Sequence, residues 1–301
     1  MQVAIAVTEP FSFAQTLRFA RRFPPLERVA IVSDDSLTAA LASRGRGWAF
    51  TLRAAPNGSG LIADVAANAP RDLAPRIADF IGAADELGAF YAAAAGDPAF
   101  APLVERQRGL HHVRFLGIEE IAAYAAMMQR TPIALAARMK RMFLDAFGHR
   151  VDVAGHTLRA MPELHELAEL DEAEIADAIG SPAKAARIVE IVRGVAAIGE
   201  PFLRAAPYAD ARAALLGVRG IGPFSANAIL MRGLGRMDDL PIAMFEREGR
   251  AVYGACWSER AIAARYAGAI GYWAYYLKAG ARTPARSAPQ PRRVGLSSAH
   301  G

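Results

Sequence analysis

The chain has 301 residues, of which 53% are hydrophobic and 22% are charged, and this composition excludes a disordered or collagen-like protein. Its apolar runs are too short to span a membrane and its N-terminus lacks a signal-peptide pattern, so we expect a soluble, cytoplasmic protein. Cys256 is the single cysteine, which excludes an intramolecular disulfide and a four-cysteine iron–sulfur cluster. The net charge is +5, and the four arginines of residues 281–301 account for most of it.

The first 85 residues mix strand and helix patterns and predict a small α+β domain. The expected elements are strands over 3–6 and 28–33, a helix over 12–23 between them, and a hairpin of strands 48–54 and 60–68 around a turn at 56–60. The Pro56 and Gly58 positions in that turn interrupt both apolar patterns. We therefore expect a small mixed sheet with a helix packed against it.

From residue 82 onward the apolar spacing becomes helical. The expected helices cover 85–95, 118–129, 132–147, 182–198, 210–218 and 223–234, followed by Ala-rich segments up to Lys278. The predicted fold class is thus α+β, with an N-terminal domain over 1–85, an all-helical core over 86–280, and a basic, disordered tail over 281–301.

The most specific segment lies between the helices expected over 210–218 and 223–234. Gly220 and Gly222 bracket one apolar residue, and Pro223 stands where a new helix takes its first turn. Both glycines suit a positive φ and a close backbone approach, and the amides that open the second helix suit a phosphate oxygen. This pattern predicts a helix-hairpin-helix that grips a nucleic-acid backbone without reading its sequence.

Through this motif the sequence resembles the helix-hairpin-helix DNA glycosylase superfamily (HhH-GPD), and within it the alkylbase DNA glycosylase II, or DNA-3-methyladenine glycosylase, type. The similarity covers residues from about 8 to 280 and includes segments 9–25, 100–115, 118–143 and 151–175. The resemblance implies two helical halves around a DNA cleft, with double-stranded DNA containing damaged bases as the partner. The histidines show no metal-ligand spacing and the sequence has no nucleotide-binding glycine motif, so we expect no metal and no other cofactor. We also expect a monomer that does not act at a membrane.

Carried over position by position, the resemblance assigns DNA contacts to one set of residues and a base pocket to another. The DNA-binding candidates are Val218, Arg219, Gly220, Gly222, Ser225, Gln129 and Arg130, of which Arg130 lies where relatives fill the gap left by a flipped base. The base-pocket candidates are Phe224, Ala228, Met244 and Trp273. Because Phe224 stands where bifunctional relatives place a lysine, a Schiff base at this position and the strand cleavage that follows it are excluded.

The resemblance fails at the catalytic position, where the family places an aspartate two residues after a proline. Pro241 is present, but Ala243 occupies the place of the aspartate. Because glycosidic cleavage passes through a cationic sugar, a carboxylate beside C1′ is expected. The nearest candidates are Asp239, which is favoured because it lies in the same loop, and then Asp238 and Glu246.

The function expected from the resemblance is a monofunctional DNA glycosylase of base excision repair, which hydrolyses the N-glycosidic bond of an alkylated base flipped out of the duplex. Bases alkylated at a ring nitrogen are cationic and leave without protonation, so they depend least on a catalytic acid. Two alternatives remain open. The chain is either a damage-binding protein that has kept the fold and lost the acid, or a glycosylase for bulky lesions, with room made by Ala228, Ala243 and Ala269.

Overall fold

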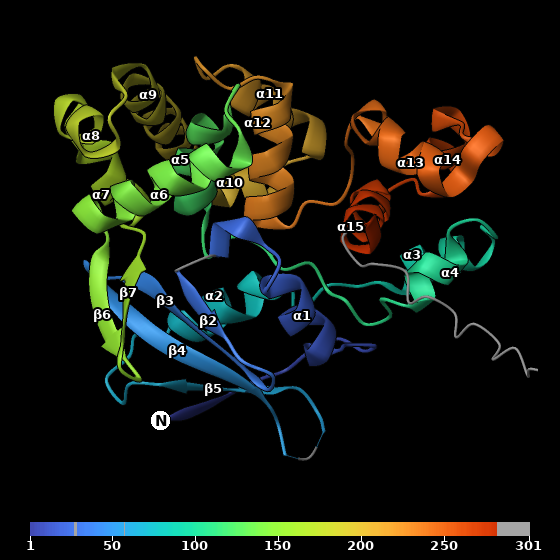
Figure 1. Cartoon of the computed structure of the whole chain (residues 1–301), viewed down its shortest axis with the longest axis horizontal. Coiled ribbons are helices and arrows are strands. Elements are labelled where there is room, and N and C mark those ends of the chain that lie inside the picture. The colour runs from blue at the N-terminus through green and yellow to red at the C-terminus, as the bar shows by residue number, and fades with distance from the viewer. Residues whose placement is uncertain (27–28, 57, 282–301) are drawn as a thin grey trace, which may run out of the picture.

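The computed structural model describes residues 1–26, 29–56 and 58–281, and it has the α+β architecture expected from the sequence (Figure 1). The expected disordered tail therefore lies, from residue 282 onward, outside the described residues. A sheet forms the base of the molecule, and two groups of helices stand above it (Figure 1). In the described ranges, no helix combines the length and the apolarity needed to cross a bilayer.

The sheet has five antiparallel strands in the order β1-β5-β4-β3-β2. Their bounds are β1 (Gln2–Ile5), β2 (Ala30–Val32), β3 (Ser36–Ser43), β4 (Arg46–Ala54) and β5 (Leu61–Val65). The predicted hairpin around residues 56–60 is confirmed as the β4–β5 pair, whereas β3 was not predicted. Helices α1 (Phe13–Ala20) and α2 (Leu73–Phe80) add apolar side chains to the same core.

The expectation of an all-helical core after residue 86 is wrong, because a β-hairpin interrupts the helices. It consists of β6 (His149–Val153) and β7 (His156–Ala160), joined by a turn at Ala154 and Gly155. Leu158 and Ala160 are buried against Ala40 and Ala42 of β3. The hairpin forms because these apolar side chains face the sheet while the alternate positions face water.

Most helices of the first group surround α5, whose residues from Ile118 to Met127 are all buried. Their bounds are η1 (Pro24–Leu26), α5 (Ile118–Met128), α6 (Ile133–Phe147), α7 (Leu164–Glu169), α8 (Glu172–Ile179), α9 (Pro182–Ile198), α10 (Glu200–Ala205), α11 (Tyr208–Leu216), α12 (Pro223–Ala228) and the π-helical η2 (Ile229–Gly233). One hydrophobic cluster runs from the sheet to Leu234. The sheet and these helices therefore share a core across the domain boundary predicted at residue 85.

The second group of helices combines segments that lie far apart in the sequence. It contains α3 (Gly88–Ala95), α4 (Ala101–Glu105), η3 (Ile242–Phe245), α13 (Glu246–Tyr253), η4 (Gly254–Cys256), α14 (Glu259–Arg265) and α15 (Ile270–Ala281) (Figure 1). Phe90 and Phe100 pack on Tyr266, and Phe100 also packs on Trp273. The protein therefore has two helical groups with separate hydrophobic clusters.

Candidate functional site

The predicted helix-hairpin-helix is present, formed by α11, a turn over residues 217–222, and α12. Gly220 has φ +94°, and a Cβ added there would lie 2.5 Å from Cδ and Nη1 of Arg187. A side chain at this position would thus meet both backbone strain and a neighbouring guanidinium. Gly222, which was also expected to suit a positive φ, has a φ of −96°, whereas the open space around it agrees with the expected close backbone approach.

Two arginines beside the hairpin share one carboxylate. Arg187 Nη1 lies 3.3 Å from Glu190 Oε2 one turn along α9, and Arg219 pairs with the other carboxylate oxygen of Glu190. The Arg219 side chain is 83% exposed. Val218 is half-buried, and its Cγ1 lies 2.3 Å from the position of a Cβ added at Gly194, so this glycine permits the close packing of the hairpin on α9.

Gln129 and Ser225, which are predicted DNA contacts, are hydrogen-bonded to each other in this structure, and their contact with DNA stays a prediction. Gln129 Nε2 donates to the Gly220 carbonyl oxygen at 2.8 Å and to Ser225 Oγ at 3.2 Å, and Ser225 is buried. Lys184 Nζ donates to the Gln129 carbonyl oxygen and, at 3.0 Å, to that of Ala126. Gln129 therefore fastens the loop after α5 to the hairpin.

Arg130 differs from its neighbour Gln129 because its side chain is exposed. Its backbone has φ +50°, the left-handed region that a non-glycine residue adopts rarely. The structure thus places an exposed cationic side chain on the loop that Gln129 holds against the hairpin. This position agrees with the one that the sequence resemblance assigns to a gap-filling residue, and that role stays a prediction.

A cavity of about 290 Å³ opens beside the hairpin, between the two helical groups. Its lining is Phe19, Phe23, Pro24, Pro25, Phe115, Ile121, Tyr124, Met128, Ile133, Phe224, Asn227, Ala228, Met231, Arg232, Leu240, Pro241, Met244, Phe245, Ala274, Tyr275 and Lys278. Three of the four predicted pocket residues, Phe224, Ala228 and Met244, are among them. Phe224 and Met244 are 49% and 46% exposed, which places apolar side chains at the mouth.

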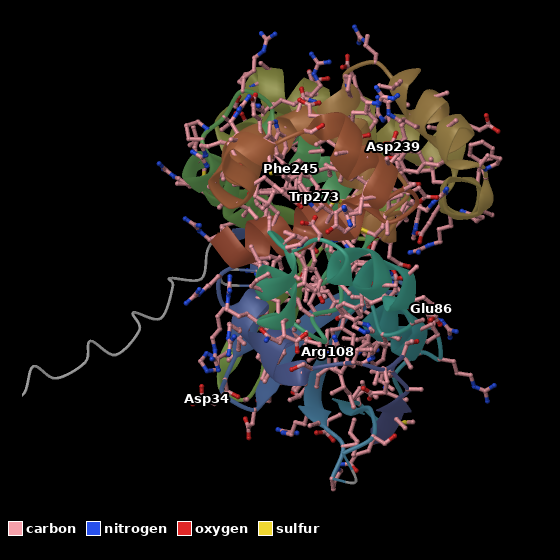
Figure 2. The ribbon with its side chains drawn as sticks, turned by 90° about the vertical axis from the view of Figure 1, so that its right-hand side faces the viewer. Asp34, Glu86, Arg108, Asp239, Phe245 and Trp273 are labelled. Carbon is pink, nitrogen blue, oxygen red and sulfur yellow. The ribbon has the colours of Figure 1, made fainter. Side chains whose placement is uncertain are left out.

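Trp273, the fourth predicted pocket residue, does not line the cavity. It is fully buried, its Nε1 donates to the Tyr253 hydroxyl at 3.0 Å, and its ring packs against Phe245 at 6.0 Å (Figure 2). The prediction was wrong because the packing of α13 on α15 encloses this ring. The rings that line the cavity instead include Phe19 and Phe23 from α1 and the turn after it, which no local pattern identified.

The three predicted acids differ in their partners, and none of them lines the cavity. Asp238 accepts from Arg236 Nε at 3.1 Å, and Glu246 accepts from Arg250 Nε at 2.7 Å along α13. Asp239 is exposed and, among the described residues, forms no ion pair. It lies apart from the Phe245 and Trp273 pair (Figure 2).

Asp239 nevertheless directly precedes, in the sequence, two residues that line the cavity, Leu240 and Pro241. The Tyr208 hydroxyl donates to the Asp239 carbonyl oxygen at 2.8 Å and fixes the loop. Burial, and then the Asp239 charge, raise the pKa of Tyr208 to about 12, so this hydroxyl stays protonated as a donor. Ala243 is exposed in η3, so the position expected for the family aspartate carries no carboxylate.

No family model matches the chain. It is 28% identical over 152 residues to a DNA-3-methyladenine glycosylase of Bacillus subtilis, with 50% of each chain covered. It is 28% identical over 149 residues to a probable bifunctional transcriptional activator/DNA repair enzyme AlkA of Mycobacterium tuberculosis, covering 48% of this chain and 29% of the relative. The chain thus spans half or less of the length of these curated relatives.

Solved structures share the fold over nearly the whole chain. A 3-methyladenine DNA-glycosylase from Archaeoglobus fulgidus superposes with a TM-score of 0.70 at 21% identity, covering 92% of this chain and 97% of that one. MBOgg1 in complex with a low-affinity DNA ligand superposes with a TM-score of 0.71 at 17% identity, covering 93% and 94%. Similarity at this level of identity establishes the architecture.

Proposed function

We propose that the chain belongs to the helix-hairpin-helix DNA glycosylase superfamily and that it is a monofunctional DNA glycosylase, which its similarity to DNA-3-methyladenine glycosylases and its fold support. It binds duplex DNA, takes an alkylated base out of the stack, and hydrolyses the N-glycosidic bond of that base. The observation that carries this proposal is the aromatic-lined cavity that opens directly beside the hairpin. Phe224 and Ala228 of α12 belong to both features, so a phosphate held by the hairpin and a base held by the cavity would lie next to each other.

The hairpin supplies the sequence-independent part of binding. Its turn is held by the bond from Gln129 to the Gly220 carbonyl oxygen, and the open space at Gly222 lets a phosphate approach the backbone. Arg187 and Arg219 add positive charge at the same turn. Arg130, exposed on the loop that Gln129 fastens, occupies the stack that the flipped base leaves.

The cavity supplies the part of binding that depends on the base. Its volume of about 290 Å³ and its aromatic lining suit a planar base that leaves water for an apolar site. The exposed Phe224 and Met244 at the mouth contact the base as it enters. Of the three small residues that would make room for a bulky lesion, Ala228 lines the cavity, whereas Ala243 and Ala269 do not.

For catalysis, the carboxylate must lie at the mouth of the cavity rather than within it. The sugar stays attached to the DNA backbone, so C1′ remains outside while the base is inside. Asp239 precedes the lining residues Leu240 and Pro241, and it carries no ion pair within the described part of the chain. Its carboxylate stabilises the cationic sugar and orients the water that adds to C1′. Phe224 has no amine, so the product is an intact strand with an abasic site.

Asp239→Asn tests this assignment, with the neighbouring Asp238→Asn as the matched control. Removing one charge-stabilising group from an active site costs about 10²–10³-fold in rate. We expect a loss of this size in single-turnover base release for Asp239→Asn, with unchanged duplex affinity. Asp238→Asn should retain the rate, because its carboxylate is bound to Arg236. Equal rates for Asp239→Asn and the unmodified protein would remove Asp239 from the mechanism.

A second function, a damage-binding protein without catalysis, is supported by one observation. None of the described residues that line the cavity has a carboxyl group, and Ala243 stands at the family's catalytic position. Such a protein would hold a lesion-containing duplex more tightly than an undamaged one and would form no abasic site. Base-release and binding assays on the same duplexes therefore separate the two functions.

A further inference from the structure

The aromatic rings of the cavity are already occupied by cations of this chain. Arg232 lines the cavity, and its Cζ lies 4.4 Å from the ring centroid of Phe23, 5.6 Å from that of Phe19 and 5.7 Å from that of Tyr275. A cation over a ring is attracted by the negative face of the π-system. One guanidinium therefore already lies beside three of the rings to which a positively charged ligand would bind.

Two lysines occupy three more of the lining rings. Lys278 Nζ lies 5.6 Å from the centroid of Phe245. Lys140 Nζ lies 5.8 Å from the centroid of Phe115 and 6.0 Å from that of Tyr124. The remaining lining ring belongs to Phe224, over which the described residues place no cation, and this ring is exposed at the mouth.

The carboxylate that pairs with Lys278 lies outside the lining of the cavity, whereas Lys278 itself belongs to that lining. Lys278 binds Glu248 Oε1 at 2.6 Å, and Lys140 binds Glu120. Lys278 and Arg232 belong to the lining and Glu248 does not, while Lys140 and Glu120 both lie outside it. A base in the cavity thus meets the ammonium group of Lys278 before the carboxylate of Glu248, in apolar surroundings that screen charge poorly.

We propose that the cavity selects an electrically neutral alkylated base and discriminates against a base of the same shape that carries a fixed positive charge. This inference rests on the proposed function and names its substrate class. A neutral base stacks on Phe224 and loses little on entering the apolar site. A cationic base gives up its hydration, finds cations of the chain beside the other rings, and is repelled by the ammonium group of Lys278.

The same charges assist the departure of a neutral base. When the bond between C1′ and the base nitrogen breaks, its electron pair stays on the base, which becomes an anion. Lys278 and Arg232 stabilise this anion, and the water that adds to C1′ releases the proton that neutralises it. A base with a fixed positive charge leaves as a neutral molecule and gains nothing from these cations.

The test compares two bases that differ in one ring atom and in formal charge. Duplexes of identical sequence contain 7-methylguanine, which is cationic, or 7-methyl-7-deazaguanine, which is neutral, both on 2′-fluoro sugars that keep the glycosidic bond intact. A third duplex contains guanine. The dissociation constants of the full chain are measured by fluorescence anisotropy, and we expect the neutral analogue to bind about tenfold more tightly than the cationic one.

Lys278→Met and Arg247→Met form a matched pair of variants. Both remove a positive charge that pairs with Glu248, but Lys278 lines the cavity, whereas Arg247 has a 91% exposed side chain and does not. Lys278→Met should reduce the preference for the neutral analogue severalfold. Arg247→Met should leave that preference as it is.

Each result has a distinct meaning. A preference for the neutral analogue that Lys278→Met weakens supports the inference. Equal or tighter binding of 7-methylguanine overturns it while leaving the proposed function in place, as does a preference that Lys278→Met and Arg247→Met weaken equally. If both lesions bind no better than guanine, the cavity does not hold a flipped base, and the proposed function fails together with the inference.

Discussion

We expect Glu190 to compete with DNA phosphate for the two arginines at the hairpin, so that its replacement by Gln tightens DNA binding. In the free protein its carboxylate lies 3.3 Å from Arg187 and also pairs with Arg219. A phosphate that reaches the hairpin must draw these guanidinium groups away from Glu190 or bind beside its negative charge. Glu190→Gln keeps the shape of the side chain and removes the charge.

The size of the effect follows from the exposure of the three side chains. Arg219 is 83% exposed, Arg187 is 39% exposed and Glu190 is 21% exposed, so both pairs are in contact with water. An exposed ion pair is worth about 0.2–1 kcal/mol, and the two together are worth about 0.4–2 kcal/mol. Binding of an undamaged duplex should therefore tighten by about 2- to 30-fold at low salt.

The assay is a salt titration of duplex affinity by fluorescence anisotropy. Because each phosphate contact contributes about 0.9 to the slope of log K against log salt, the slope should steepen by up to about 2 for two released arginines. Glu105→Gln is the control, since Glu105 forms an exposed pair with Arg108 at the same sequence spacing on the distant α4. Unchanged or weaker binding by Glu190→Gln, or an equal gain for Glu105→Gln, would refute the reasoning.

Two further predictions concern stability. Lys140 and Glu120 form an ion pair whose two side chains are each only 3% exposed, so Lys140→Met should lower the free energy of unfolding by about 3–5 kcal/mol in urea titrations. Adding Glu120→Gln should recover part of this loss, and a loss below about 1 kcal/mol for Lys140→Met would contradict the prediction. Burial raises the pKa of Glu119 from 4.5 to about 7, so between these two pH values the folded state binds more protons than the unfolded state. The free energy of unfolding should therefore fall as the pH rises from 4.5 to about 7. Glu119→Gln should remove this fall, and a parallel pH profile in the variant would count against it.

Local sequence patterns were sufficient to predict the helix-hairpin-helix. Pro223 at the first position of α12 and Gly220 with φ +94° follow from local rules of backbone conformation, and both are confirmed. The β6–β7 hairpin escaped prediction because its turn, Ala154 and Gly155, lacks the usual Asn-Gly signal. The side chains of its two strands are also mostly half-buried or exposed.

The cavity depends on long-range packing that no local pattern contains. Phe19 and Phe23 lie more than a hundred residues before Phe224 in the sequence, yet all three line one cavity. Trp273 shows the converse, because an aromatic residue expected in the pocket is enclosed by α13 and α15. Gln129 was expected to contact DNA, and its bonds to Gly220 and Ser225 became visible only once the loop and the hairpin were brought together.

Release of a modified base by the purified full chain decides whether the cavity serves catalysis. Duplexes that carry one 1,N6-ethenoadenine or one 7-methylguanine are incubated with excess protein, and alkali then reveals abasic sites. We expect abasic sites without prior strand cleavage, and we expect them to form faster from the neutral ethenoadenine. Gly222→Asp should form no abasic sites, because a carboxylate in the open space of the hairpin repels phosphate. Tight binding of both duplexes with no abasic site from either would contradict a glycosylase and establish a damage-binding protein.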